Sequence, residues 1–124
     1  MLTLKKNYEF QKTLKRGKWY NASLINVYID QNDKDLNYIG IAVGKKVSKS
    51  SVKRNRIRRL IREAYRLNEK NIKKGLNIVM VWKTSCSFEL ANFKSIEKDL
   101  LFCFKKANVL LFNELENKEE DENV

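Results

Sequence analysis

Three stretches of the chain have the apolar spacing of an amphipathic helix. The first covers residues 7–16, and Gly17 follows where glycine often ends a helix. The second covers about residues 52–67 and the third about residues 88–111. The predicted buried stripes are Phe10 and Leu14 in the first helix, Ile57, Leu60, Ile61, Ala64 and Tyr65 in the second, and Phe93, Ile96, Leu100, Phe104, Ala107 and Leu111 in the third.

Other segments have the pattern of strands. Residues 23–30 and 37–43 alternate between two faces, and a short extra strand is expected around residues 19–22. The polar residues 31–35 predict a hairpin-type loop, whereas the nearly continuous apolar run 76–82 is typical of a central strand. In the first of these strands, one face is expected to carry Ile25, Val27 and Ile29 and the other Leu24, Asn26 and Tyr28. In the second, one face is expected to carry Ile39, Ile41 and Val43 and the other Tyr38, Gly40 and Ala42.

The order of these elements is helix, strands, helix, strand, helix, which includes a β-α-β unit. It predicts a single-domain α+β sandwich with one mixed sheet and helices packed against it. A length of 124 residues, without proline, internal repeats or linkers, agrees with one domain. We assign the domain to residues 1–112.

The remaining residues, 113–124, form an acidic segment. It holds six acidic residues and one lysine, so its net charge is −5. The formal net charge of the whole chain is +11, so residues 1–112 carry a net charge of +16. Such a composition predicts a solvated, disordered tail. A second hypothesis is that the tail folds back on the basic surface and competes weakly with RNA.

Residues 45–62, called the basic segment below, hold nine lysines and arginines and no acidic residue. This density of charge indicates a polyanionic partner, most often nucleic acid. Ser50 or Ser51 is placed to cap the helix that follows. The apolar stripe of that helix faces the core, so its guanidinium groups point outward, where they can bind phosphate bidentately. The cationic residues are Lys45, Lys46, Lys49, Lys53, Arg54, Arg56, Arg58, Arg59 and Arg62.

Composition excludes several classes of function. No run of eighteen apolar residues is present, and the N-terminal segment lacks the apolar stretch of a signal peptide, so we expect a cytoplasmic protein without a membrane partner. Cys86 and Cys103 are expected to be reduced thiols. The chain has no histidine and no metal-ligand spacing, and the acidic cluster at 30–35 lacks the pattern of a calcium loop, so we interpret it as a polar turn.

Two motifs carry a resemblance to a known family. The sequence GIAVGKKV at residues 40–47, followed by KRNRIRRLIRE at 53–63, resembles the bacterial ribonuclease P protein subunit. The resemblance extends over about residues 3–112 and implies an α-β-β-β-α-β-α order with a left-handed β-α-β crossover. It further implies a non-catalytic subunit that binds the ribonuclease P catalytic RNA and the 5′ leader of precursor tRNA. The RNA would hold most of the Mg²⁺ and carry the catalytic centre, and no obligatory protein partner is implied.

The resemblance also assigns site residues. RNA binding is expected from Asn55 and the nine cations of the basic segment. A leader-binding cleft is expected from Phe10, Tyr28, Lys12 and Arg16, because single-stranded RNA stacks its bases on aromatic side chains. Two departures concern Leu14, where many members have a second aromatic residue, and the loop at 48–51, which is one residue longer than in some members.

Two other functions remain open at this point. A general or ribosome-associated RNA-binding protein would use the same basic helix without any role in cleavage. A DNA-binding module would place the helix in the major groove, although its dense charge and few Asn, Gln and Ser side chains suit base readout poorly. An alternative role for Asn55 is to cap the helix or pack within the fold, and an alternative role for Phe10 is to pack in the core.

Overall fold

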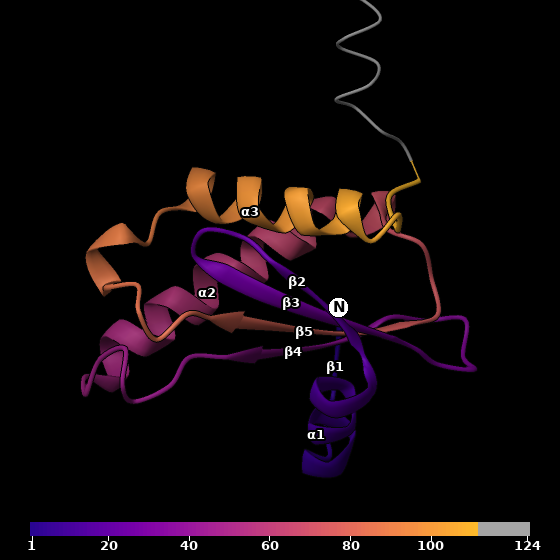
Figure 1. The fold of residues 1–124 in the computed structure, drawn as a ribbon, viewed down its shortest axis with the longest axis horizontal. Helices are drawn as coiled ribbons and strands as arrows, with labels where there is room; N and C mark the ends of the chain where they lie inside the picture. The colour runs from indigo at the N-terminus through magenta and orange to yellow at the C-terminus, as the bar shows by residue number, and fades with distance from the viewer. Residues whose placement is uncertain (112–124) are drawn as a thin grey trace, which may run out of the picture.

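The computed structural model describes residues 1–111, which form an α+β sandwich with one mixed five-stranded sheet. The predicted fold class is confirmed. Helix α1 covers one face of the sheet, and helices α2 and α3 lie on the other (Figure 1). The elements are β1 (Leu2–Thr3), α1 (Asn7–Arg16), β2 (Lys18–Asn21), β3 (Ile25–Gln31), β4 (Tyr38–Ala42), α2 (Ser51–Asn68), β5 (Leu76–Trp82) and α3 (Phe93–Lys106), with 3₁₀ turns at Glu69–Asn71 and Phe88–Leu90.

Strand β5 lies at the centre of the sheet, whose order is β1-β4-β5-β3-β2. It pairs parallel to β4 and antiparallel to β3. The predicted central strand and β-α-β unit, β4-α2-β5, are therefore confirmed. The prediction of a hairpin at residues 31–35 is wrong, because β5 is inserted between β3 and β4. The most apolar strand takes the position in which both of its edges are paired and its face toward α2 and α3 is buried.

The face of the sheet beneath α2 and α3 forms the core. In register across three strands, Ile29, Ile78 and Ile39 make one buried row. The predicted stripe of α2 is confirmed, with Ile57, Ile61, Ala64 and Tyr65 buried and Leu60 half-buried against the core. The aromatic ring of Tyr65 meets Phe104 of α3 edge to face, with ring centroids 6.4 Å apart.

The ends of α1 and α2 follow from local chemistry. Helix α1 has the predicted bounds, and the N–H of Gly17 donates to the carbonyl of Thr13 at 2.9 Å. Gly17 has φ −69°, so glycine is not required there for a left-handed conformation. A Cβ atom would instead lie 2.6 Å from the carbonyl oxygen of Thr13. At α2, Ser50 is the cap, because its hydroxyl accepts a hydrogen bond from the N–H of Lys53.

Helix α3 is shorter than predicted at both ends. Asn92 begins it, since its side chain accepts a hydrogen bond from the N–H of Ser95 at 3.0 Å. Asn108 lies beyond its last turn with φ 58°, a left-handed conformation in which asparagine is tolerated. Leu110 then pairs with Ile72. Leu111 is therefore exposed outside the helix and does not continue the buried stripe.

Smaller expectations are also resolved. Asn32 ties the loop after β3, with its side-chain oxygen accepting from Lys34 N–H and its amide donating to Leu36 O and Asn77, as expected for a polar turn. Both cysteines are free thiols in the described residues. The two-residue strand β1 was not predicted. Residues 113–124, assigned to an acidic tail, lie outside the described residues.

Candidate nucleic-acid interface

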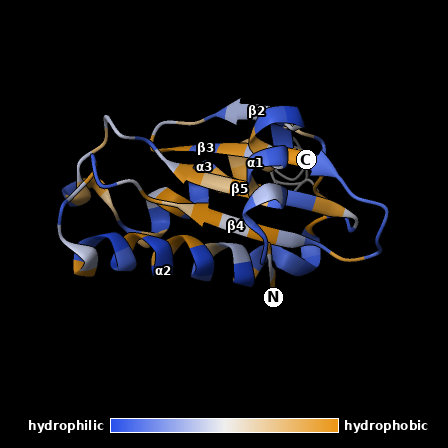
Figure 2. Ribbon diagram, turned by 90° about the horizontal axis from the view of Figure 1, so that it is seen from below, coloured by the Kyte–Doolittle hydropathy of each residue, from blue (hydrophilic) through white to orange (hydrophobic). Residues whose placement is uncertain are grey.

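The basic segment begins where β4 ends and continues along the outer side of α2. Figure 2 shows α2 beside β4, with hydrophilic residues along most of its exposed length. Six of its cationic side chains are exposed and have no intramolecular partner among residues 1–111. They are Lys45, Lys46, Lys49, Arg56, Arg59 and Arg62. These groups are free to neutralise phosphates.

Arg54 and Arg58 are held by the protein itself. Arg54 donates from Nη1 to the carbonyl oxygen of Ser48 at 2.9 Å. Arg58 donates from Nη1 to the side-chain oxygen of Asn55 at 2.7 Å and from Nη2 to the carbonyl oxygen of Val43 at 3.3 Å. These bonds attach the start of α2 to the end of β4 and to the loop between them. Asn55 therefore positions Arg58 and keeps its own amide group available.

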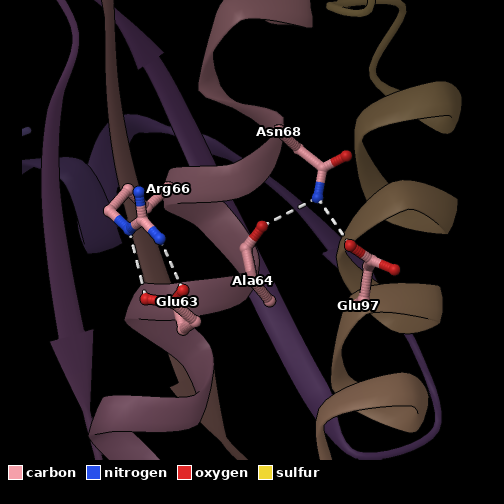
Figure 3. A network of polar contacts seen from close by, with 5 residues as sticks. All are labelled: Glu63, Ala64, Arg66, Asn68 and Glu97. Carbon is pink, nitrogen blue, oxygen red and sulfur yellow. Dashed lines mark hydrogen bonds and ion pairs between the residues drawn. The ribbon is translucent and has the colours of Figure 1, made fainter.

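Other charges near α2 are also partly engaged. The ammonium of Lys53 lies 5.3 Å from the centroid of the Phe88 ring. At the other end of α2, Arg66 forms an ion pair with Glu63 at 2.6 Å, and this hydrogen bond lowers the pKa of the Glu63 carboxyl (Figure 3). Asn68 donates to Ala64 O and to Glu97 of α3, so this end of the helix is fixed to its neighbour (Figure 3).

The sheet face covered by α1 carries the second group of predicted residues. Trp19, Tyr28, Val79 and Gly40 are register partners across four strands and form one transverse row. The ring of Phe10 lies over Gly40, since a Cβ atom there would be 2.7 Å from two of its ring carbons. At the other end, Trp19 and Tyr28 stack with centroids 6.4 Å apart and planes 26° apart. We call Phe10, Tyr28 and Trp19 the aromatic row.

This face is partly closed and partly open. Val79 is fully buried under α1, whereas Phe10 and Tyr28 are half-buried and Trp19 is exposed. Figure 2, viewed from the α1 side, shows the helix over one half of the sheet and the rest uncovered. The structure thus brings Phe10 and Tyr28 to the same face, as predicted, and separates them by the buried position of Val79.

The two cations predicted on the rim of this cleft lie further out. Because successive helical residues are about 100° apart, Lys12 points roughly 200° away from Phe10 around α1, and it is exposed. Arg16 is also exposed and lines a shallow hollow with Lys18, Tyr20 and Asp30. Neither cation shares the inward face of α1.

Two residues of this face were not predicted as site residues. Trp19 is one, because the short alternation of Trp19 and Asn21 against Tyr20 and Ala22 does not show which of the two pairs lies on the side of Tyr28. Asn26 is the other: its side-chain oxygen is buried and has no hydrogen-bond partner among the described residues. Both face the same side of the sheet as Tyr28.

The comparisons with known proteins agree with this geometry. The family model described as Ribonuclease P matches residues 2–108. The chain belongs to the ribonuclease P protein family. The ribonuclease P protein component of Clostridium acetobutylicum is 40% identical over 113 residues, covering 90% of this chain and 92% of the relative. That of Clostridioides difficile is 41% identical over 107 residues, covering 86% and 91%.

Solved structures of ribonuclease P proteins share the fold. The Staphylococcus aureus protein has a TM-score of 0.77 at 28% identity, covering 89% of this chain and 98% of that chain. The Thermotoga maritima protein has a TM-score of 0.76 at 29% identity, covering 86% and 97%. Membership of this family connects the chain to an endoribonuclease complex of tRNA processing. Among residues 1–111, no helix is long and apolar enough to cross a membrane.

Proposed function

We propose that this chain binds the catalytic RNA of ribonuclease P through the basic segment and the 5′ leader of precursor tRNA through the aromatic row. By holding both, it promotes endonucleolytic removal of the leader and formation of the mature 5′ end. The chain itself acts as a non-catalytic, cytoplasmic subunit without an obligatory protein partner.

The observation that carries this proposal is the continuity of the two surfaces through β4. Gly40 of this strand lies under the ring of Phe10. Four residues past the glycine, Gly44 begins the turn that presents Lys45 and Lys46 to solvent. A single strand of RNA crossing the sheet at Phe10 therefore arrives beside the exposed cations at the start of α2. Stacking surfaces next to a cationic groove are the combination that single-stranded RNA requires.

The residues take two kinds of role in this proposal. Exposed cations such as Arg56, Arg59 and Arg62 supply phosphate contacts, which give affinity without sequence preference. Arg54 and Arg58 keep the loop before α2 in place, so they position the neighbouring cations. Phe10 and Tyr28 supply stacking to the leader, which is a contact that mature tRNA lacks.

Mg²⁺ is proposed to be held mainly by the RNA. Among the described residues, no three His, Cys, Asp or Glu side chains gather to hold a metal ion. The exposed lysines and arginines of the basic segment suit binding to the RNA phosphates that would also hold Mg²⁺. When bound, the metal would supply the activation of water for hydrolysis, and the residues of this chain would bind and orient the RNA substrates.

The test compares precursor tRNA with mature tRNA, using the chain assembled with ribonuclease P RNA. We expect the assembled complex to bind the precursor more tightly. Tyr28→Ala should weaken binding of precursor tRNA by roughly 1–3 kcal/mol, the range for loss of one stacked base. The affinity for mature tRNA should not change. The matched control is Tyr8→Ala, because Tyr8 is an exposed aromatic residue of α1 outside the aromatic row. Equal affinity for both RNAs would instead indicate a general RNA-binding protein.

A further inference from the structure

Trp19 is an exposed indole on the last strand of the sheet. Its side chain is 59% exposed, while the other tryptophan of the chain, Trp82, is fully buried. Within residues 1–111, strand β2 is the sheet edge, so no further strand of this part of the chain lies beyond Trp19. One side of its ring stacks on Tyr28, and the exposed remainder extends the aromatic row beyond β3.

The cations that precede Trp19 in the sequence do not lie on its face of the sheet. Lys18 precedes Trp19 in β2, but successive strand residues point to opposite faces, so Lys18 lies on the side of its register partner Ile29. Lys18 and Arg16 line a hollow that does not include Trp19. Asp30 also lines this hollow, but one of its carboxylate oxygens accepts a hydrogen bond from the N–H of Gln31. The indole of Trp19 and the ring of Tyr28 therefore form a stacking surface for a base that does not depend on these cations.

We propose that the indole of Trp19 is a stacking site for one nucleobase of single-stranded RNA, additional to Phe10 and Tyr28. The inference rests on the proposed function and deepens it, since the nucleobase belongs to the 5′ leader. In the sheet order, β2 lies at the opposite side of β5 from β4. Trp19 therefore contacts the leader nucleotide farthest from those beside the basic segment.

A purely structural role makes a different prediction for Trp19. Cross-strand pairs of aromatic and other apolar side chains stabilise antiparallel strands, and Trp19 is the register partner of Tyr28. An apolar side chain without a ring would serve that role in part. A stacking site needs a planar ring, so phenylalanine should retain function and leucine should not.

The first readout is the tryptophan fluorescence of the full chain assembled with ribonuclease P RNA, titrated with leader-bearing precursor tRNA. Trp82 should give a constant background, because it is buried and its indole N–H donates to Cys86 O at 2.8 Å. We expect quenching of the exposed indole on precursor binding. The quenching should be absent with mature tRNA and absent in Trp19→Phe, which keeps its affinity.

The second readout is affinity for the precursor in the same complex. Trp19→Ala and Trp19→Leu should weaken binding by roughly 5- to 150-fold, as expected for loss of one stacked base, with no change for mature tRNA. The matched control is Tyr8→Ala, which removes a side chain that is 64% exposed but lies outside the aromatic row. It should bind as the unmodified chain does.

The outcomes separate this inference from the proposed function. If the unmodified complex prefers precursor tRNA but Trp19 shows no quenching, or Trp19→Leu binds normally, the stacking site is wrong and the proposed function stands. Equal weakening of precursor and mature tRNA binding in Trp19→Ala would also overturn it. If the unmodified complex does not distinguish the two RNAs, both proposals fail.

Discussion

At the scale of single residues, the arginines of α2 divide into those that hold the fold and those that face solvent. Arg58 is half-buried and donates to Asn55 and to the carbonyl of Val43. Arg62 is exposed without a partner among the described residues. One turn of helix therefore separates a positioning residue from a residue available to phosphate.

This division predicts different results for two matched substitutions. Arg58→Ala should lower the free energy of unfolding by roughly 1–3 kcal/mol, because hydrogen bonds from a charged donor are lost. Arg62→Ala should leave the unfolding free energy nearly unchanged. In binding to ribonuclease P RNA, it should reduce the slope of log affinity against log salt by about 1. Denaturant unfolding and salt titrations measure the two effects, and a large loss of stability in Arg62→Ala would contradict the assignment.

At the scale of elements, α1 packs over β3 and β5, and its Phe10 ring reaches β4 at Gly40. The ring of Phe10 fills the space in which Gly40 lacks a side chain. A methyl group there forces Phe10 to move, and overpacking of this kind typically costs about 1–3 kcal/mol. Gly40→Ala should lower the melting temperature and weaken precursor binding together, because it displaces both α1 and the stacking ring.

A double-mutant cycle checks this contact. Adding Phe10→Ala to Gly40→Ala should cost less stability than the sum of the two single variants, because the cavity and the added methyl group compensate. Additive losses would show that the two residues do not interact through this contact. The control pair is Gly17→Ala with Phe10→Ala, since the Cβ at Gly17 meets the backbone oxygens of Thr13 and Ile29 rather than Phe10.

The packing of α2 and α3 predicts a fall in stability at alkaline pH. Burial raises the pKa of Tyr65 from 10.0 to about 12, with Glu69 adding to the shift, and that of the Cys103 thiol from 9.0 to about 11, with Asp99 adding to it. Both groups lose their protons at lower pH when unfolded than when folded. Between about pH 9 and 12 the unfolded state therefore binds fewer protons, and the free energy of unfolding falls as pH rises.

Melting temperatures from pH 7 to 12 measure this effect. The comparison is between the unmodified chain and the double variant Tyr65→Phe, Cys103→Ala, which lacks both groups. We expect the double variant to be less stable at pH 7 and to lose less stability above pH 9. Parallel curves for the two proteins would contradict the assignment to these two groups.

Local pattern was sufficient for elements whose ends and faces depend on their own residues. The bounds of α1 and β5 agree with the spacing of apolar residues and with the glycines that precede or follow them. The pairing of strands was not predictable in this way, because the pattern of β3 and β4 does not show that β5 inserts between them. The ends of α3 depend on Asn92 and Asn108, and the spacing of apolar residues does not show where such polar residues end a helix.

For the candidate site, the sequence placed the cations but not their partners. The acceptors of Arg54 and Arg58 are mostly backbone carbonyls at Ser48, Lys49 and Val43, and only the folded loop brings them within reach. Trp19 was missed as a site residue because a four-residue edge strand gives too little alternation to fix its face without its partner. Register with Tyr28 supplied that information.

At the scale of the whole molecule, the chain carries a formal net charge of +11, with nine of its cations in the basic segment. Affinity for RNA should therefore fall steeply with salt, because each neutralised phosphate releases a counterion. The aromatic row adds stacking contacts that require the 5′ leader and that depend little on salt concentration. Discrimination between precursor and mature tRNA should thus persist at salt concentrations that weaken both.

We propose above all that this chain promotes leader removal by a catalytic RNA and has no nuclease activity of its own. The most direct measurement is cleavage of a 5′-extended precursor tRNA by bacterial ribonuclease P RNA at low Mg²⁺, with and without the chain. We predict that the chain restores correct 5′ cleavage when the RNA is present and cuts nothing alone. Tight RNA binding without stimulation, or cleavage by the chain alone, would contradict the account.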